Sequence, residues 1–160
     1  MEQQQLYGNQ GYNFDRLPRK TITIDLDTNA DGSKVYTLQE PITIDKLSDI
    51  YIDSFITNHI PATSSTNDVF ILDVKEFNIQ SVSNNQYYHN KLLIPNTIGT
   101  PSAATTTIAH RATKFNFISS INPTKLTSLE ISLTDNNTTS GPGKLGSGAA
   151  YITFMIVARD

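Results

Sequence analysis

Apolar and polar residues alternate in several short segments, and this two-residue period is typical of half-buried β-strands. In residues 21–26 the apolar side chains of Ile22, Ile24 and Leu26 fall on one face and polar side chains on the other. Residues 128–134 alternate in the same way around Leu129 and Ile131. Each segment therefore predicts a strand with one face on a core and one face outward.

Further strands are predicted where strand-favouring residues lie between turn-forming residues. Residues 149–158 are apolar on both faces, which indicates a central strand, and residues 49–60 are apolar on both faces too. In residues 69–79 the apolar positions change parity near Lys75, which predicts a β-bulge there. Phe115 and Phe117 are expected to point inward. The other predicted strands are residues 34–38, 41–45, 87–94, 105–110 and 114–119.

Eight to ten strands without a helical period predict an all-β protein. Two packed antiparallel sheets are the simplest way to bury their apolar faces, so we expect an antiparallel β-sandwich. About eight main strands with long connections favour a single jelly roll, formed by residues 20–160. Residues 1–19 have no strand or helix period and are expected to be an extended N-terminal arm or tail. Its aromatic residues Tyr7, Tyr12 and Phe14 are candidates for contacts with a neighbouring subunit.

Composition and charge narrow the class of partner. The 160-residue chain has no cysteine, which excludes a disulfide scaffold and fits a reducing compartment. Its net charge of −3 argues against nucleic acid as a partner. No apolar run is long enough for a membrane span and the first residues do not form a signal peptide, so we expect a soluble cytosolic product without direct membrane insertion.

The charge is unevenly divided between the two halves of the chain. Residues 1–80 hold 6 basic and 12 acidic side chains (6 − 12 = −6), and residues 81–160 hold 6 basic and 3 acidic ones (6 − 3 = +3). Two interpretations stay open. The uneven charge is either the result of chance and loop placement, or it forms complementary patches that are used in self-association.

The segment from Asp27 to Gly32 resembles the first half of a calcium loop. Asp27, Asn29 and Asp31 supply side-chain oxygens on alternate residues, and Gly32 allows the bend. The twelfth position, which holds a glutamate in such loops, is Leu38. The alternative is a hairpin turn in which Asp and Asn side chains bond their own backbone, with no cofactor bound.

No motif in the sequence indicates catalysis, and we expect that the protein is not an enzyme. The glycine pattern of residues 141–146 precedes a predicted strand instead of a helix, so it does not fit a phosphate loop. His59, His89 and His110 lack metal-ligand spacing, and no serine lies near a histidine in a known catalytic pattern.

Five segments, read together, resemble small jelly-roll proteins of giant nucleocytoplasmic large DNA viruses, of the minor capsid or penton type. They are residues 50–57 (IYIDSFIT), 69–81 (VFILDVKEFNIQS), 91–96 (KLLIPN), 115–123 (FNFISSINP) and 154–159 (FMIVAR). The resemblance covers roughly residues 35–160 and includes no catalytic signature.

This resemblance implies a virion structural protein, a subunit of an icosahedral shell that forms a homo-oligomer, a pentamer at the fivefold vertex. Its implied partners are the major capsid protein and other minor capsid proteins, and its implied location is the virion capsid, synthesised and assembled in the host cytoplasm. The alternative from the residues is a glycan- or receptor-binding β-sandwich, assisted by calcium at Asp27–Asp31, with Tyr87 and Tyr88 as a sugar-stacking surface.

Overall fold

A computed structural model describes residues 18–58, 69–95, 108–111, 117–136, 144–146 and 148–159. Tyr7, Tyr12 and Phe14, the aromatic residues of the predicted arm, lie outside these residues, as does His59. The described part holds nine strands and one short 3-10 helix, η1 (Lys75–Phe77). The strands are β1 (Arg19–Leu26), β2 (Lys34–Ile44), β3 (Ser48–Thr57), β4 (Val69–Val74), β5 (Leu92–Pro95), β6 (Ile108–Arg111), β7 (Phe117–Ile121), β8 (Thr124–Asp135) and β9 (Ala150–Ala158).

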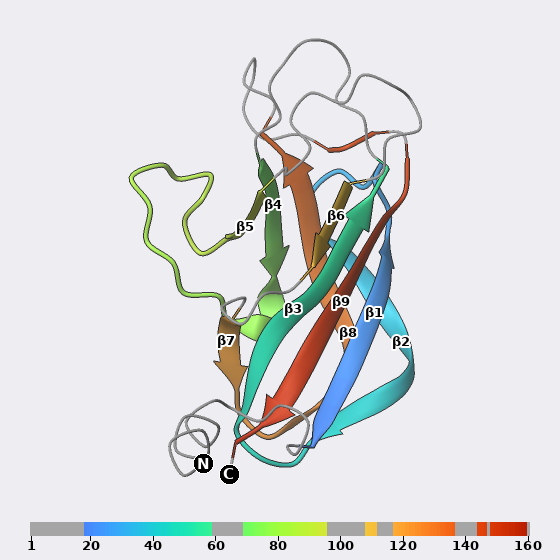
Figure 1. The fold of residues 1–160 in the computed structure, drawn as a ribbon, viewed down its shortest axis with the longest axis vertical. Coiled ribbons are helices and arrows are strands. Elements are labelled where there is room, and N and C mark those ends of the chain that lie inside the picture. The colour runs from blue at the N-terminus through green and yellow to red at the C-terminus, as the bar shows by residue number, and fades with distance from the viewer. Residues whose placement is uncertain are drawn as a thin grey trace, which may run out of the picture.

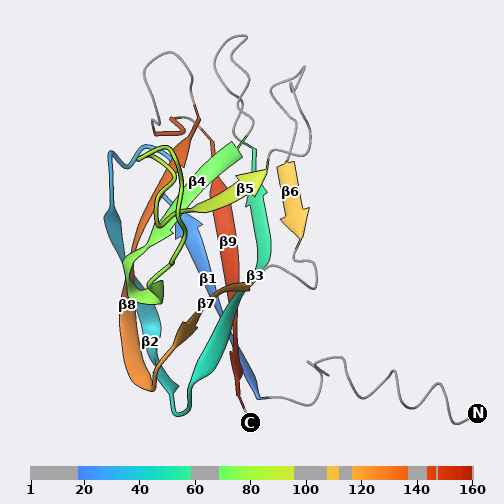
Figure 2. The same cartoon turned by 90° about the vertical axis from the view of Figure 1, so that its left-hand side faces the viewer.

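The strands form two antiparallel sheets that pack as layers (Figures 1 and 2). The first sheet has the order β1-β9-β3, with β6 and β7 both beside β3, and the second has the order β2-β8-β4-β5. β6 pairs with residues 54–57 of β3 and β7 with residues 48–51, so these two short strands share one position at the sheet edge. Eight strand positions in two sheets, with the chain crossing repeatedly between them, confirm the predicted jelly-roll sandwich.

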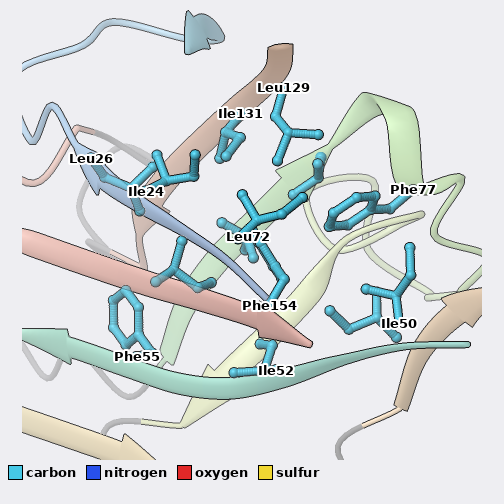
Figure 3. Close-up of a cluster of buried hydrophobic side chains, with 14 of the residues drawn as sticks. Ile24, Leu26, Ile50, Ile52, Phe55, Leu72, Phe77, Leu129, Ile131 and Phe154 are labelled. Atoms are coloured by element: carbon cyan, nitrogen blue, oxygen red, sulfur yellow. The ribbon is translucent and has the colours of Figure 1, made fainter. Parts of the chain in front are cut away.

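The core lies between the sheets and is built from the inward residues of both (Figure 3). Phe55, Phe70, Phe77 and Phe154 are fully buried there. The Phe77 and Phe154 rings meet edge to face with centroids 4.9 Å apart, and Phe55 and Phe70 meet at 5.1 Å. These contacts join the two layers, because Phe55 and Phe154 lie in β3 and β9 of the first sheet, whereas Phe70 lies in β4 of the second sheet and Phe77 in η1 directly after β4.

The central strand predicted at residues 149–158 is confirmed as β9, which pairs with both β1 and β3. The predicted inward face of residues 21–26 is also confirmed, since Ile22, Ile24 and Leu26 are buried.

Several predicted boundaries were wrong. Residues 34–38 and 41–45 belong to one strand, β2, whose register against β8 shifts between Thr37 and Ile42. β2 is an edge strand, so it tolerates Pro41, which lacks a backbone donor. β3 already ends at Thr57, and β5 begins only at Leu92 because residues 84–90 form bends and turns.

The β-bulge predicted near Lys75 was also wrong. β4 ends at Val74, and η1 with a left-handed Asn78 (φ 46°) follows it. This turn corrects the parity as a bulge would, so that Phe77 and Ile79 still point into the core. The prediction that Phe117 points inward was wrong as well, because its side chain is 49% exposed on the outer face of the first sheet. Phe115 lies outside the described residues.

Candidate assembly surface

Five apolar side chains gather on the outer face of the first sheet, and we call them the outer patch: Tyr51, Ile56, Phe117, Tyr151 and Met155. The strand register places them in two cross-strand groups. Ile56 of β3 pairs with Tyr151 of β9, and Tyr51 of β3 pairs with Met155 of β9 on one side and Phe117 of β7 on the other. The three most exposed members are Phe117 at 49%, Tyr151 at 44% and Ile56 at 40%.

Alternation explains why the patch faces outward. Along β9, Ile152 and Phe154 point into the core, so Tyr151 and Met155 must point away from it. Tyr51 and Phe117 then pack on each other, with ring centroids 5.8 Å apart in an edge-to-face arrangement. An edge-to-face pair fixes the orientation of both rings, so this part of the patch is preorganised.

The row between the two groups is polar but uncharged. Thr153 of β9 lies between Ser54 of β3 and Thr23 of β1, and the Thr23 and Thr153 hydroxyls are 3.0 Å apart. Carboxylates occur beside the patch at Asp25, which pairs with Tyr151, and at Asp53, where the register of β3 shifts. The face can therefore be covered by another surface without removing many charges from water.

The outer patch was missed by sequence reasoning, although a signal was present. Residues 49–60 and 149–158 are apolar on both faces, and that pattern indicated only that β9 is central. In an antiparallel sandwich one face of each sheet normally meets solvent and is polar. Apolar residues on both faces of two adjoining strands therefore also indicate an outer face that is covered by another surface.

The three predicted calcium ligands lie in the connection between β1 and β2. The Asp27 side chain accepts a hydrogen bond from the Asn29 backbone N–H at 3.0 Å and pairs with the Lys34 ammonium group at 2.7 Å. The Ala30 N–H donates to the Asp27 carbonyl at 3.2 Å, and Gly32 has a φ of 84°. These are the hydrogen bonds expected of the hairpin-turn alternative.

Calcium binding by Asp27, Asn29 and Asp31 stays a prediction. All three side chains are exposed, and both carboxylate oxygens of Asp27 already have partners within the protein. The described residues contain no group of three or more His, Cys, Asp or Glu side chains that could hold a metal ion.

The bond from Lys34 holds the pKa of Asp27 below its ordinary value, with the Asn29 backbone N–H contributing in the same direction. A depressed carboxyl pKa adds stability above the unfolded value of about 4, and this is lost as the pH falls through the folded value. We therefore expect Lys34→Met to raise the pKa of Asp27 toward its ordinary value, as measured by NMR titration of the side-chain carboxyl carbon. An unchanged pKa would show that Lys34 does not hold this carboxylate in solution.

A second exposed apolar group lies on the loop from Ser81 to Lys91. Internal hydrogen bonds hold this loop closed, including those from Asn90 N–H to the Ser81 carbonyl at 2.9 Å and from the Ser81 hydroxyl to the Lys91 carbonyl at 3.0 Å. Val82 is 94% exposed on it, and Tyr87 is also exposed whereas Tyr88 is half-buried. The sugar-stacking hypothesis for this tyrosine pair stays a prediction.

His89 is exposed on the same loop, and His110 lies in β6 of the first sheet, so the structure does not bring these two histidines together.

Within the described ranges, no helix is both long enough and apolar enough to cross a membrane.

Comparisons with known proteins do not place the chain in a family. No protein-family model matches it, and no curated protein matches it either. A solved structure described as a Nora virus structure aligns at 15% identity with a TM-score of 0.21. The alignment covers 89% of this chain and spans 64% of that chain.

Proposed function

We propose that this protein is a structural subunit of a virion, specifically a minor capsid or penton subunit of an icosahedral large DNA virus. The observation that carries the proposal is the outer patch on the first sheet. Monomeric proteins seldom leave several large apolar side chains exposed close together on one face, and such groups mark surfaces that bind other proteins. Aromatic residues are also enriched in the centres of such interfaces.

The assignment to a virion comes from the resemblance of five segments to small capsid and penton proteins, a resemblance that includes no catalytic signature. A jelly roll can serve many functions, so the fold alone does not select this one. The proposed partners are other copies of the chain, in a pentamer at the fivefold vertex, together with the major capsid protein and other minor capsid proteins. Synthesis and assembly in the host cytoplasm belong to the same proposal.

A pentamer requires a head-to-tail interface, in which one surface of each subunit meets a different surface of its neighbour. The outer patch supplies one uncharged surface. The other surface would come from the uneven charge of the chain, −6 in residues 1–80 and +3 in residues 81–160, in its interpretation as complementary patches on each subunit, which would favour one relative orientation of neighbouring copies.

The proposal is tested by sedimentation velocity of the full-length chain over a range of concentrations. We expect an oligomer for the natural sequence and a shift to monomer for the double variant Phe117→Ser with Tyr151→Ser. Loss of two central aromatic contacts should weaken association by at least about tenfold, or about 1.4 kcal/mol.

The matched control is the double variant Val82→Ser with Tyr87→Ser, which removes exposed apolar side chains from the Ser81–Lys91 loop and leaves the outer patch intact. It should associate like the natural sequence. A natural chain that stays monomeric at every concentration, and is missing from purified virions, would overturn the proposed function.

A further inference from the structure

β1 begins and β9 ends at the same end of the sandwich, at the bottom of Figure 1. A pocket of about 170 Å³ is lined by residues from this end. Its apolar lining comes from three parts of the chain: Pro18 before β1, Ile44 at the end of β2, and Ile156 and Ala158 of β9. A cavity of roughly 150 Å³ with apolar walls is large enough to hold benzene. This pocket is therefore of the right size and character for one aromatic ring.

The charged residues of the pocket are mostly cations. Lys20, Lys46 and Arg159 line it together with a single carboxylate, Asp45, and Arg159 is already paired with Asp49 at 2.6 Å. The Lys20 ammonium group lies 3.9 Å from Asp45 and also bonds the Thr43 carbonyl. Lys46 is exposed and forms no ion pair with any residue that the structure describes. The pocket thus suits a ligand that presents an aromatic ring beside a carboxylate.

The sequence immediately before this pocket contains such a pair, at Phe14 and Asp15. Pro18 continues the course of β1, because its carbonyl accepts a hydrogen bond from the Ala158 N–H at 3.2 Å. At Pro18 the described backbone therefore still follows the axis of β1. Seventeen residues can extend to at most about 60 Å, which is long enough to reach another copy.

We propose that the pocket binds the N-terminal segment of a second copy of this chain, with Phe14 in the apolar lining and Asp15 beside Lys46. The inference rests on the proposed function, since it requires that copies of the chain assemble. The pocket would be a second contact between subunits, in addition to the outer patch. It would link the subunits through an exchanged segment.

The absence of cysteine makes a direct test possible, because any introduced cysteine is unique. One full-length variant carries Arg16→Cys, next to Asp15, and another carries Leu47→Cys, next to Lys46. The two are distinguished by a size tag, mixed, assembled and treated with a short bis-maleimide. We expect a cross-linked heterodimer on a denaturing gel. Arg16→Cys mixed with Val82→Cys, on the Ser81–Lys91 loop, gives the background.

The charge contact is tested in the same assay. Lys46→Glu should lower the heterodimer yield about fivefold, which corresponds to about 1 kcal/mol for an exposed ion pair, and Asp15→Lys in the other chain should restore it. Lys144→Glu makes the same charge change two residues before Gly146, whose backbone N–H donates to the Thr28 carbonyl beyond the far end of β1, and should leave the yield unchanged.

Two results would overturn the inference. In the first, a molecule that carries both cysteines is cross-linked within itself, and no cross-link forms between molecules. This would mean that the segment folds onto its own pocket. The other is an oligomer by sedimentation with no link above background. In that second case the proposed function survives and only the segment exchange fails, whereas a chain that is strictly monomeric and missing from purified virions removes both.

Discussion

We expect Phe154→Ala to lower the free energy of unfolding by about 3–5 kcal/mol, the range measured for removing a large aromatic side chain from a protein core. Phe154 is fully buried on the central strand β9 and packs edge to face on Phe77. The substitution leaves a cavity between the sheets that rigid β-strands cannot close. At about 2–4 °C per kcal/mol, the melting temperature should fall by roughly 6–20 °C.

The matched control is Phe117→Ala, which makes the same chemical change on the outer face of the same sheet. Because half of the Phe117 side chain is already exposed, its loss removes mainly the contact with Tyr51, worth about 1 kcal/mol. Both variants are compared by urea denaturation at a concentration where the chain is monomeric. Equal losses for the two substitutions would contradict the described positions of these rings.

We expect the second largest effect from Asp49→Ala, a loss of about 2–3 kcal/mol. Asp49 is only 7% exposed, and one of its carboxylate oxygens accepts hydrogen bonds from Arg159 Nε at 2.9 Å, Arg159 Nη2 at 2.6 Å and the Ser120 hydroxyl at 2.8 Å. This carboxylate joins β3, β7 and the end of β9. Hydrogen bonds to charged groups contribute about 1.5–3 kcal/mol, and their removal leaves the partners unsatisfied.

Asp53→Ala on the same strand is the control for this second prediction. Asp53 is exposed, so its replacement should change the free energy of unfolding by less than about 0.5 kcal/mol. Urea denaturation of both variants measures the difference. If Asp49→Ala proved as mild as Asp53→Ala, the Arg159 contact would contribute nothing to the folded state.

The sequence alone predicted the fold class because strand alternation is a local property. Ile22, Ile24 and Leu26 face one side by stereochemistry alone, and a two-sided apolar run such as residues 149–158 indicates a central strand. What failed depended on non-local pairing. Nothing local distinguishes an edge strand that tolerates Pro41 from two separate strands, and a 3-10 turn corrects the parity after Val74 as well as a bulge does.

The apolar residues of the candidate assembly surface can be read from the sequence, but which of them lie together on one face cannot. Phe117 was expected to point inward because apolar residues usually do, and only the register against Tyr51 shows that it faces outward. The pocket beside Pro18 could not be foreseen at all. It depends on three segments, the start of β1, the turn after β2 and the end of β9, whose proximity is set by the sheet topology.

The position of β9 has a consequence for the order of events during synthesis. Leu26 of β1 pairs with Ala150 of β9, and Thr57 of β3 pairs with the same residue, so β1 and one edge of β3 must wait for β9 to leave the ribosome. Pairings this distant in sequence form slowly, and the unpaired apolar faces of β1 and β3 stay open to wrong partners in the meantime. A nascent or prematurely terminated chain that lacks β9 is thus the form of this protein most dependent on chaperones.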